Sequence, residues 1–344
     1  MPTAPAAPLV SVIIPSYNHA HLVGTAIESA LSTAGVALEV IVVDDGSVDD
    51  TASVVRTYDS RVRYVRQSNG GHGEARNTGH QEARGAYVAW LDSDDIAEPG
   101  RFRMQAELLT RYPSVALVST GFSAFDEAGT VWDSYAEHYY GVIAREGLAA
   151  LFEHTASVEL GGPEGSMRAT FHHGQLYPRI VFSNFVHPPT VMMRKEVWHA
   201  AGPLDQQFAT ATDWEFFVRA SRLFAFGYLD LPLLRYRRSV GQQTDDANVR
   251  RNIPREMRAL EAMRRADPAL DRERARLGAL YRHWHLAMAN ASASDDRAGA
   301  LKSLLRSLGH GFDPRAFLVA ASRIAAPRAL TPMLGRIRRA MRGG

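Results

Sequence analysis

The chain has 344 residues, of which 46% are hydrophobic, so it can fill the core of one large domain or of two modest ones. It contains no cysteine, which excludes disulfides, zinc–thiolate sites and thiol nucleophiles. The net charge of +2 hides an asymmetry, because residues 297–344 hold ten Lys or Arg against the single acid Asp313 and carry +9. The residues before this basic tail hold 29 basic and 36 acidic side chains, a net charge of −7.

The two ends of the chain bear on where the protein acts. Residues 1–8 lack the basic and apolar segments of a secretion signal, and no apolar run is long enough to cross a bilayer, so we expect a cytoplasmic protein. In the basic tail, Leu330, Leu334, Ile337 and Met341 recur at helical spacing between arginines, which is typical of a helix on an anionic membrane. That pattern predicts peripheral contact with the inner face of the cytoplasmic membrane. The commoner alternative is a terminal helix that docks on the body of the protein.

Short apolar segments alternate with segments of helical periodicity over the first 240 residues. The expected strands are residues 9–15, 38–43, 62–65, 86–91, 115–119 and 189–193, and the expected helices are residues 22–31, 49–58, 73–83, 99–112, 195–201 and 214–219. Strands that are apolar on both faces predict an α/β fold, with a mostly parallel sheet flanked by helices. Residues 121–180 look irregular, and no strand signals follow residue 252. We predict an α/β domain over residues 1–240 and a helical region over 241–344.

Polar clusters follow three of the expected strands, at 16–18, 44–47 and 92–95. In a parallel sheet the ligand crevice lies beyond the carboxyl ends of the strands, so the fold should gather these clusters. Asp92 and Asp94 are two residues apart in an extended segment, so their carboxylates can face one ligand, such as Mg²⁺ or Mn²⁺ with substrate phosphates. Acidic residues after a strand are also common turn formers, and Asp-Gly at 45–46 is a strong turn signal by itself.

A glycine-rich segment at residues 69–79 turns helical and carries Arg76. Backbone amides at a helix start favour anions, and a guanidinium is suited to phosphate. The segment is neither a Walker loop nor a dinucleotide fingerprint after the first strand. An ordinary loop with a surface arginine remains the alternative.

The motifs as a set resemble the inverting family 2 glycosyltransferases of the GT-A fold. The resemblance rests on Val12–Asn18, Glu39–Thr51, Gly73–Gly79 and Ala89–Asp95, together with Arg194–Asp205 and Thr212–Arg219, and covers residues 9–240. It implies a metal-dependent enzyme that uses Mn²⁺ or Mg²⁺ and takes a sugar from a nucleotide sugar, with a UDP-sugar as the first expectation. The implied acceptor is a glycan or a lipid-linked hydroxyl in polysaccharide, glycolipid or cell-envelope glycan synthesis. No nucleic-acid partner is implied.

The resemblance also assigns roles to residues. Asp213 matches the family's catalytic base, although Thr212 stands where the family commonly has Glu. Asp94 would be the main metal ligand, with Asp92 close to the metal or ribose. The donor contacts would be Pro15, Tyr17, Asn18, Asp44, Asp45, Arg76, Asp92 and Ser93. The Gln-x-x-Arg-Trp motif of processive members is absent, so we expect a non-processive enzyme.

Acceptor contacts are predicted in the irregular segment, because recognition residues often lie in loops. The candidates are Trp132 and the run 138–140 with Tyr139, and also Trp214, although an aromatic residue at helix spacing usually packs inward. His187 is expected to be solvated or locally hydrogen-bonded rather than a metal ligand. Residues 235–239 and 242–244 are expected to close over the phosphates, or alternatively to form a solvated edge strand and turn.

Two other functions remain open. A sugar-nucleotide nucleotidyltransferase would need a basic glycine-rich loop after the first strand, where Pro15-Ser-Tyr-Asn18 stands instead. A degenerate module that binds a nucleotide sugar without turnover is the non-enzymatic alternative.

Overall fold

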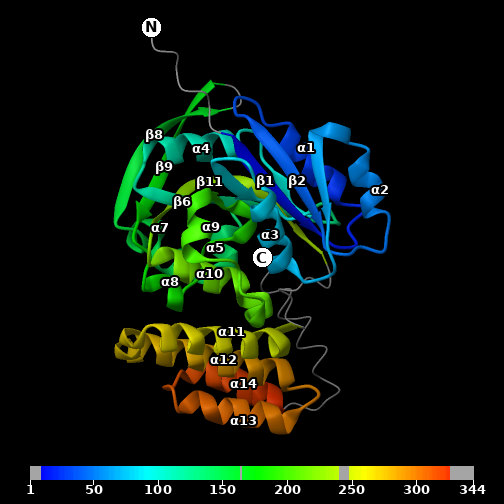
Figure 1. Cartoon of the computed structure of the whole chain (residues 1–344). Coiled ribbons are helices and arrows are strands. Elements are labelled where there is room, and N and C mark those ends of the chain that lie inside the picture. The colour runs from blue at the N-terminus through cyan, green and yellow to red at the C-terminus, as the bar shows by residue number, and fades with distance from the viewer. Residues whose placement is uncertain (1–8, 163–164, 240–247, 326–344) are drawn as a thin grey trace. The chain divides into compact units, whose positions relative to one another are not determined.

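The structure is a computed structural model that describes residues 9–162, 165–239 and 248–325 (Figure 1). The chain divides into two compact units, residues 1–239 and 240–344. The predicted boundary at residue 240 lies next to this division. The candidate site residues all belong to the first unit.

The first unit is built on one mixed sheet. Its strands are β1 (Val10–Ser16), β2 (Leu38–Asp44), β3 (Val62–Arg66), β4 (Tyr87–Trp90), β5 (Ile96–Ala97), β6 (Val115–Asp126), β7 (Val131–Trp132), β8 (His154–Gly162), β9 (Gly165–Gly174), β10 (Met192–Arg194) and β11 (Ala225–Arg238). The spatial order is β3-β2-β1-β4-β10-β6-β11-β9-β8, with β5 paired to β11 and β7 to β6. The predicted α/β class is confirmed.

The direction of the strands decides where their polar ends meet. β1, β2, β3 and β4 run parallel, β10 runs against β4 and β6, and β6 runs parallel to β11. β6 and β11 therefore point the same way as β1 to β4. The carboxyl ends of β1, β2, β4, β6 and β11 share one edge of the sheet, which we call the carboxyl edge. Because β10 is reversed, the segment that precedes it lies at the same edge.

Helices cover the sheet. Those of the first unit are α1 (Val23–Leu31), α2 (Thr51–Arg56), α3 (His72–Glu82), α4 (Arg101–Arg111), α5 (Ala136–Tyr139), α6 (Gly141–Glu146), α7 (Leu148–Leu151), α8 (Arg179–Phe182), α9 (Lys195–Ala201) and α10 (Thr212–Ser221), with 3-10 turns at Asp59–Arg61, Pro188–Thr190 and Gln206–Ala211. Figure 1 shows α3, α9 and α10 in front of the sheet. Trp90 of β4 contacts Phe216 and Phe217 of α10, with ring centroids 5.8 and 5.7 Å apart.

Gly79 allows α3 to approach the sheet closely. A Cβ at this position would lie 2.4 Å from Cγ2 of Ile13 on β1, so a larger residue would push the helix away from the strand. The glycine that lowers helix propensity in the sequence therefore has a packing reason.

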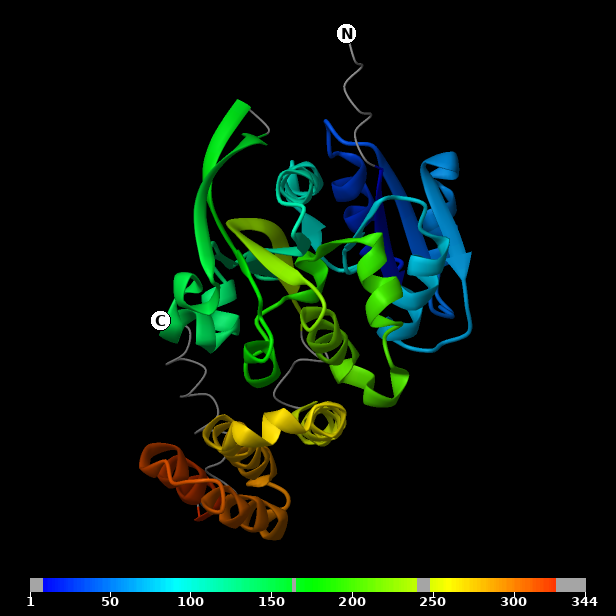
Figure 2. The same cartoon turned by 60° about the vertical axis from the view of Figure 1, so that its left-hand side comes forward.

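Two sequence-based expectations about the fold are wrong. Residues 121–180 are not irregular, because β6 continues to Asp126 and β8 and β9 form a long antiparallel hairpin, which Figure 2 shows as an extended ribbon. Alternation along β8 buries Val158 and Leu160 between exposed neighbours, the period of a half-buried strand. Residues 189–193 contain a 3-10 turn, and the strand there is Met192–Arg194.

The end of β11 is paired on both sides only in part. Its residues 235–238 pair with β6, and Leu234 and Arg235 pair with β5. Residues 236–238 therefore have one strand partner among the described residues, so the expected edge strand is correct for them and wrong for Arg235. Residues 242–244, which were expected to close over the phosphates, lie outside the described residues.

The second unit is helical, as predicted. It consists of α11 (Val249–Ala266), a 3-10 turn at Pro268–Arg272, α12 (Arg274–Ser292), α13 (Arg297–Leu308) and α14 (Pro314–Ala325). Leu286, Ala289, Leu304 and Ala320 form its buried core. The tail positions 330–341 lie outside the described residues. In the described parts of the chain, no helix is both long enough and apolar enough to cross a membrane.

Candidate active site

The acidic segment after β4 is held by an arginine from α3. Nη2 of Arg76 lies 2.7 Å from Oδ1 of Asp92, and the guanidinium lies over the ring of Trp90, 4.8 Å from its centroid. Burial, the largest single effect, raises the pKa of Asp92, but the charges of Arg76 and His72 and the hydrogen bond from Arg76 together lower that pKa below its ordinary value. Arg76 is only 4% exposed, so the alternative of an ordinary surface arginine does not hold.

The pKa of Asp94 is shifted in the direction opposite to that of Asp92. Burial and then the charge of Asp92 raise the pKa of Asp94, while the neighbouring His19 acts in the opposite direction. Nδ1 of His19 is 2.7 Å from Oγ of the buried Ser93. His19 comes from the loop after β1, so the polar segments after β1 and β4 meet, as the sequence predicted.

The chemistry of these groups fits a hard divalent cation. Carboxylate oxygens are the ligands that Mg²⁺ and Mn²⁺ prefer, and a cation would relieve the repulsion that raises the pKa of Asp94. Among the described residues, no group of three or more His, Asp or Glu could hold a metal by itself. A cation at Asp94 would therefore take most of its ligands from water and from a phosphate-bearing substrate, which is usual for Mg²⁺.

Asp213 lies in the first turn of α10 and belongs to the same electrostatic group. Burial raises its pKa, the guanidinium of Arg76 acts against this shift, and Asp92 adds to it. Oδ1 of Asp213 accepts a hydrogen bond from the backbone N–H of Trp214 at 2.8 Å. Arg76 and Asp92 therefore both act on Asp213, so Asp213 lies near the ion pair of Arg76 and Asp92, and the role of Asp213 stays a prediction.

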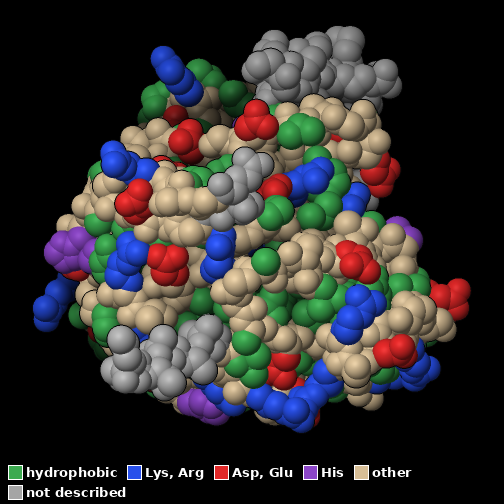
Figure 3. Space-filling model, turned by 90° about the horizontal axis from the view of Figure 1, so that it is seen from above, with side chains coloured by type: hydrophobic (Ala, Val, Ile, Leu, Met, Phe, Trp, Pro, Cys, Tyr) green, Lys and Arg blue, Asp and Glu red, His purple; other side chains and the backbone are tan. Residues whose placement is uncertain are grey.

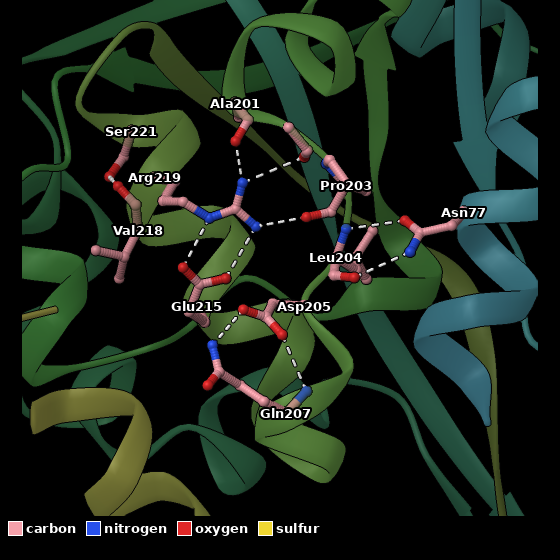
Figure 4. Close-up of polar contacts among 11 residues, drawn as sticks. Asn77, Ala201, Pro203, Leu204, Asp205, Gln207, Glu215, Val218, Arg219 and Ser221 are labelled. Atoms are coloured by element: carbon pink, nitrogen blue, oxygen red, sulfur yellow. Dashed lines mark hydrogen bonds and ion pairs between the residues drawn. The ribbon is translucent and has the colours of Figure 1, made fainter. Parts of the chain in front are cut away.

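A polar network fixes the segment that leads into α10 (Figure 4). Arg219 holds both oxygens of Glu215 at 2.7 and 2.9 Å and donates to the carbonyls of Ala201, Gly202 and Pro203. These bonds fasten the end of α9 to α10, and so fix the direction in which α10 starts.

Asn77 ties this segment to α3. Its Nδ2 donates to the carbonyl of Leu204 at 2.9 Å, and its Oδ1 accepts the N–H of Leu204 at 2.8 Å. Figure 4 shows the two bonds between Asn77 and Leu204. Because Asn77 follows Arg76 in α3, the helix that carries the arginine also holds the segment before α10.

Asp45 and Asp44 order the loops after β2 and β3. Asp45 accepts hydrogen bonds from Gln67 and from the N–H groups of Gly70 and Gly71, just before α3. Asp44 is fully buried and accepts from the N–H of Ser47 and the hydroxyl of Tyr64. Both carboxylates therefore have internal roles, and their donor contacts stay predictions.

The loop after β1 is joined to the loop after β2. Asn18 has a left-handed φ of 54°, and its Oδ1 accepts the N–H of Val48, while Ser47 Oγ accepts the N–H of Asn18. Tyr17 is 46% exposed at this edge, and Pro15 is buried within β1. The donor-binding roles of these three residues also stay predictions.

An aromatic group lies between α5, the segment before β10 and the end of β11. His187 stacks on Phe122 with centroids 4.1 Å apart, and its Nδ1 is 3.1 Å from the hydroxyl of Tyr140. Burial lowers the pKa of His187 to about 3, so it is neutral and not solvated. Burial and neighbouring acidic groups, Asp213 among them, raise the pKa of Tyr140.

The predicted acceptor candidates fall in different places. Tyr139 belongs to the aromatic group, with its centroid 5.3 Å from that of His187, and Trp132 is 5.8 Å from Tyr135. Trp214 is 8% exposed, and its indole N–H donates to the carbonyl of Ile180, so it packs inward. The roles of all three in acceptor binding stay predictions.

Sequence reasoning missed several residues of the site. His19 was missed although it directly follows the recognised segment 12–18, and His72 was missed within the glycine-rich segment; both act on the pKa of Asp94. Arg237 belongs to the segment 235–239 that was expected to close over the phosphates, but its contacts with the acidic segment were not predicted: its N–H donates to Oδ1 of Asp95 and its Nε to the carbonyl of Asp94, each at 3.0 Å. No sequence signal connects residues 94 and 237.

Comparison with known proteins agrees with this geometry. Residues 11–162 match the family described as Glycosyl transferase family 2. The chain is 30% identical over 235 residues to the putative glycosyltransferase EpsH of Bacillus subtilis, which covers 67% of this chain and 61% of that protein. It spans 21% and 38% of the lengths of two uncharacterized glycosyltransferases from Rickettsia felis and Rickettsia prowazekii.

Two solved structures share the fold. The mannosyltransferase PcManGT from Pyrobaculum calidifontis, in complex with GDP-Man and Mn²⁺, aligns with a TM-score of 0.56 and 20% identity over 96% of this chain and 86% of that chain. TarS 1–349 of S. aureus, in complex with UDP-GlcNAc, aligns with a TM-score of 0.51 and 17% identity over 92% and 88%. At these identities the likeness concerns the fold.

Proposed function

Since the chain belongs, through residues 11–162, to glycosyl transferase family 2, we propose that it transfers a sugar from a nucleoside diphosphate sugar to an acceptor hydroxyl with inversion at the anomeric carbon. The observation that carries the proposal is the shared electrostatic environment of Asp92, Asp94 and Asp213 at the carboxyl edge. The products would belong to polysaccharide, glycolipid or cell-envelope glycan synthesis.

Asp213 is the proposed general base. A carboxylate that accepts the proton of the acceptor hydroxyl makes that oxygen a better nucleophile as it attacks the anomeric carbon. Burial raises the pKa of Asp213, which makes it a stronger base than an exposed aspartate, and the nearby Arg76 keeps the shift limited. The network of Arg219 and Asn77 holds the base in position.

Asp94 and Asp92 are the proposed ligands of Mn²⁺ or Mg²⁺. The metal would supply positive charge that offsets the charge of the departing nucleoside diphosphate. Arg76, in α3 (His72–Glu82), pairs with Asp92 and so balances the negative charge of that carboxylate beside the site. PcManGT with GDP-Man and Mn²⁺ and TarS with UDP-GlcNAc support a nucleotide-sugar donor. A UDP-sugar is our first choice.

A thermal-shift panel tests the donor class. We expect one nucleoside diphosphate, UDP first, to stabilise the full chain only when Mn²⁺ is present, because the metal joins the phosphates to the carboxylates. Asp94→Asn should remove the metal-dependent part of the shift. The matched control Asp271→Asn changes an exposed carboxylate in the second unit and should keep it. If every nucleotide gave the same shift in melting temperature with and without Mn²⁺, a metal-dependent donor site would be refuted.

Contact with an anionic membrane is proposed for the second unit. Leu301, Leu305 and Leu308 form an exposed apolar row on α13, beside the exposed Lys302 and Arg306, and the basic tail follows. Apolar side chains flanked by cations suit an anionic lipid surface. Co-sedimentation with vesicles that contain phosphatidylglycerol should fall when the three leucines become serines. Equal sedimentation of both proteins would refute the contact.

A further inference from the structure

Three arginines at the end of β11 are held by aromatic rings. The guanidinium carbons of Arg235 and Arg237 lie 5.0 and 4.5 Å from the ring centroid of Phe125, and that of Arg238 lies 4.8 Å from Trp132 and 5.6 Å from Tyr135. A guanidinium that stacks on a ring keeps its in-plane N–H groups available for bidentate bonds to a carboxylate or a phosphate. The rings thus orient cations without neutralising them.

Two of these cations have little compensating charge from the residues that the structure describes. Arg235 is exposed and approaches Glu98 only at 3.9 Å, the outer limit of an ion pair. Arg238 is exposed and forms no ion pair with any of the residues that the structure describes. Figure 3 shows basic and acidic side chains interspersed over the face seen from above. We call Arg235 and Arg238 together the arginine pair.

A path of rings joins the arginine pair to the proposed base. The centroids of Tyr135 and Tyr139 are 6.2 Å apart, and those of Tyr139 and Tyr140 are 4.7 Å apart. Tyr140 in turn lies close enough to Asp213 for that carboxylate to affect its pKa. Tyr135 is buried and Tyr139 is partly exposed, so Tyr139 is the ring of this path that a molecule with a hydroxyl at Asp213 would contact on its way toward Arg238.

The arginine pair is also fixed relative to the acidic segment. β5, which directly follows Asp95, pairs with Leu234 and Arg235 of β11. Arg237 donates to Asp95 and to the carbonyl of Asp94, each at 3.0 Å. These bonds make the arginine pair a rigid part of the carboxyl edge rather than a loose surface feature.

We propose that the arginine pair binds an anionic group, a carboxylate or a phosphate, on the acceptor, at a distance from the hydroxyl that reacts. The partly exposed ring of Tyr139 would contact the part of the acceptor between the two points. This inference rests on the proposed function, because it assigns the side of the site that contains Asp213 to the acceptor. The diphosphate of the donor is the other source of the same chemistry, so the experiment separates the two.

Binding of charged and neutral probes to the full chain tests the inference without turnover. The probes are trigalacturonic acid, its methyl ester as the neutral form, and a glycerol phosphate oligomer, followed by calorimetry. We expect one anionic probe to bind about tenfold more tightly than the neutral ester and to weaken in high salt, because exposed ion pairs are screened. The double variant R235Q/R238Q should lose about tenfold in affinity for that probe.

Controls make the outcomes distinct. The control R84Q changes an exposed arginine after α3 and should bind the probe like the unaltered protein. The Mn²⁺-dependent shift with UDP should be unchanged in R235Q/R238Q, and its absence in the unaltered protein would count against the proposed function rather than against the arginine pair. Equal binding of charged and neutral probes would overturn the inference. The inference would also be overturned if R235Q/R238Q lost the thermal shift with UDP and Mn²⁺ but bound the anionic probe as tightly as the unaltered protein, because the arginine pair would then bind the donor.

Discussion

Replacing Asn77 by alanine should destabilise the first unit through one buried backbone segment. The amide of Asn77 bonds to both the N–H and the carbonyl of Leu204, at 2.8 and 2.9 Å, and accepts the indole N–H of Trp198 at 3.2 Å. The carbonyl of Leu204 keeps a second donor, Gln206, at 3.0 Å. The N–H of Leu204 would lose the partner that Asn77 provides.

The magnitude follows from these contacts. The lost bond to the carbonyl of Leu204 contributes roughly 1 kcal/mol net, and the buried N–H of Leu204 left unsatisfied costs about 1–3 kcal/mol. The total is about 2–4 kcal/mol, a large part of the stability of an ordinary domain. The control Q81A removes an amide from an exposed position on α3 and should change the free energy of unfolding by less than about 0.5 kcal/mol.

Urea unfolding followed by tryptophan fluorescence measures the effect, because four of the five tryptophans lie in the first unit. N77A should lower the midpoint without changing the slope, since the same surface is exposed on unfolding. A midpoint equal to that of the unaltered protein would refute the view that Asn77 supports the segment before α10.

Two further predictions concern α3. Burial lowers the pKa of His80 to about 3, below the value of about 6.5 in an unfolded chain. The stability that neutral His80 contributes is therefore present above pH 6.5 and is lost as the pH falls toward 3, and the loss between pH 7.5 and 5 is about 2 kcal/mol. The variant H80Q should show a correspondingly weaker pH dependence of the urea midpoint. An identical pH dependence in both proteins would contradict this. Gly79→Ala places a Cβ 2.4 Å from Ile13 and should cost about 1–3 kcal/mol of unfolding free energy, and an unchanged melting temperature would show that α3 does not need the close approach.

The sequence predicted the helices and strands that depend only on residues near one another in the chain. The strand at 10–16 and the helix at 195–201 were recognised because apolar runs and helical spacing are sufficient there. The β8–β9 hairpin was missed because its pairing joins residues such as His154 and His173, and the Gly-Gly-Pro between them suggested only a loop. Residue 189 was assigned to a strand although two prolines there favour a turn.

In the candidate site, too, the contacts that follow from strand order were predicted, and those that depend on long-range packing were not. The meeting of the segments after β1 and β4 was predicted because parallel strands end at one edge. The bond from Asn77 to Leu204 spans 127 positions, and the bond from Arg237 to Asp95 spans 142, so neither could be read from spacing. The charge of Arg76 was recognised, but its burial against Asp92 depends on how α3 packs.

The role of Asp213 as the proton acceptor is tested most directly by the turnover of D213N. The donor that gives the largest Mn²⁺-dependent thermal shift is supplied with an acceptor, and release of the nucleoside diphosphate is measured beside its binding. Loss of a general base should slow release by about 100-fold or more, while the affinity for the nucleoside diphosphate with Mn²⁺ stays within about twofold. Near-normal release by D213N would contradict the role of Asp213.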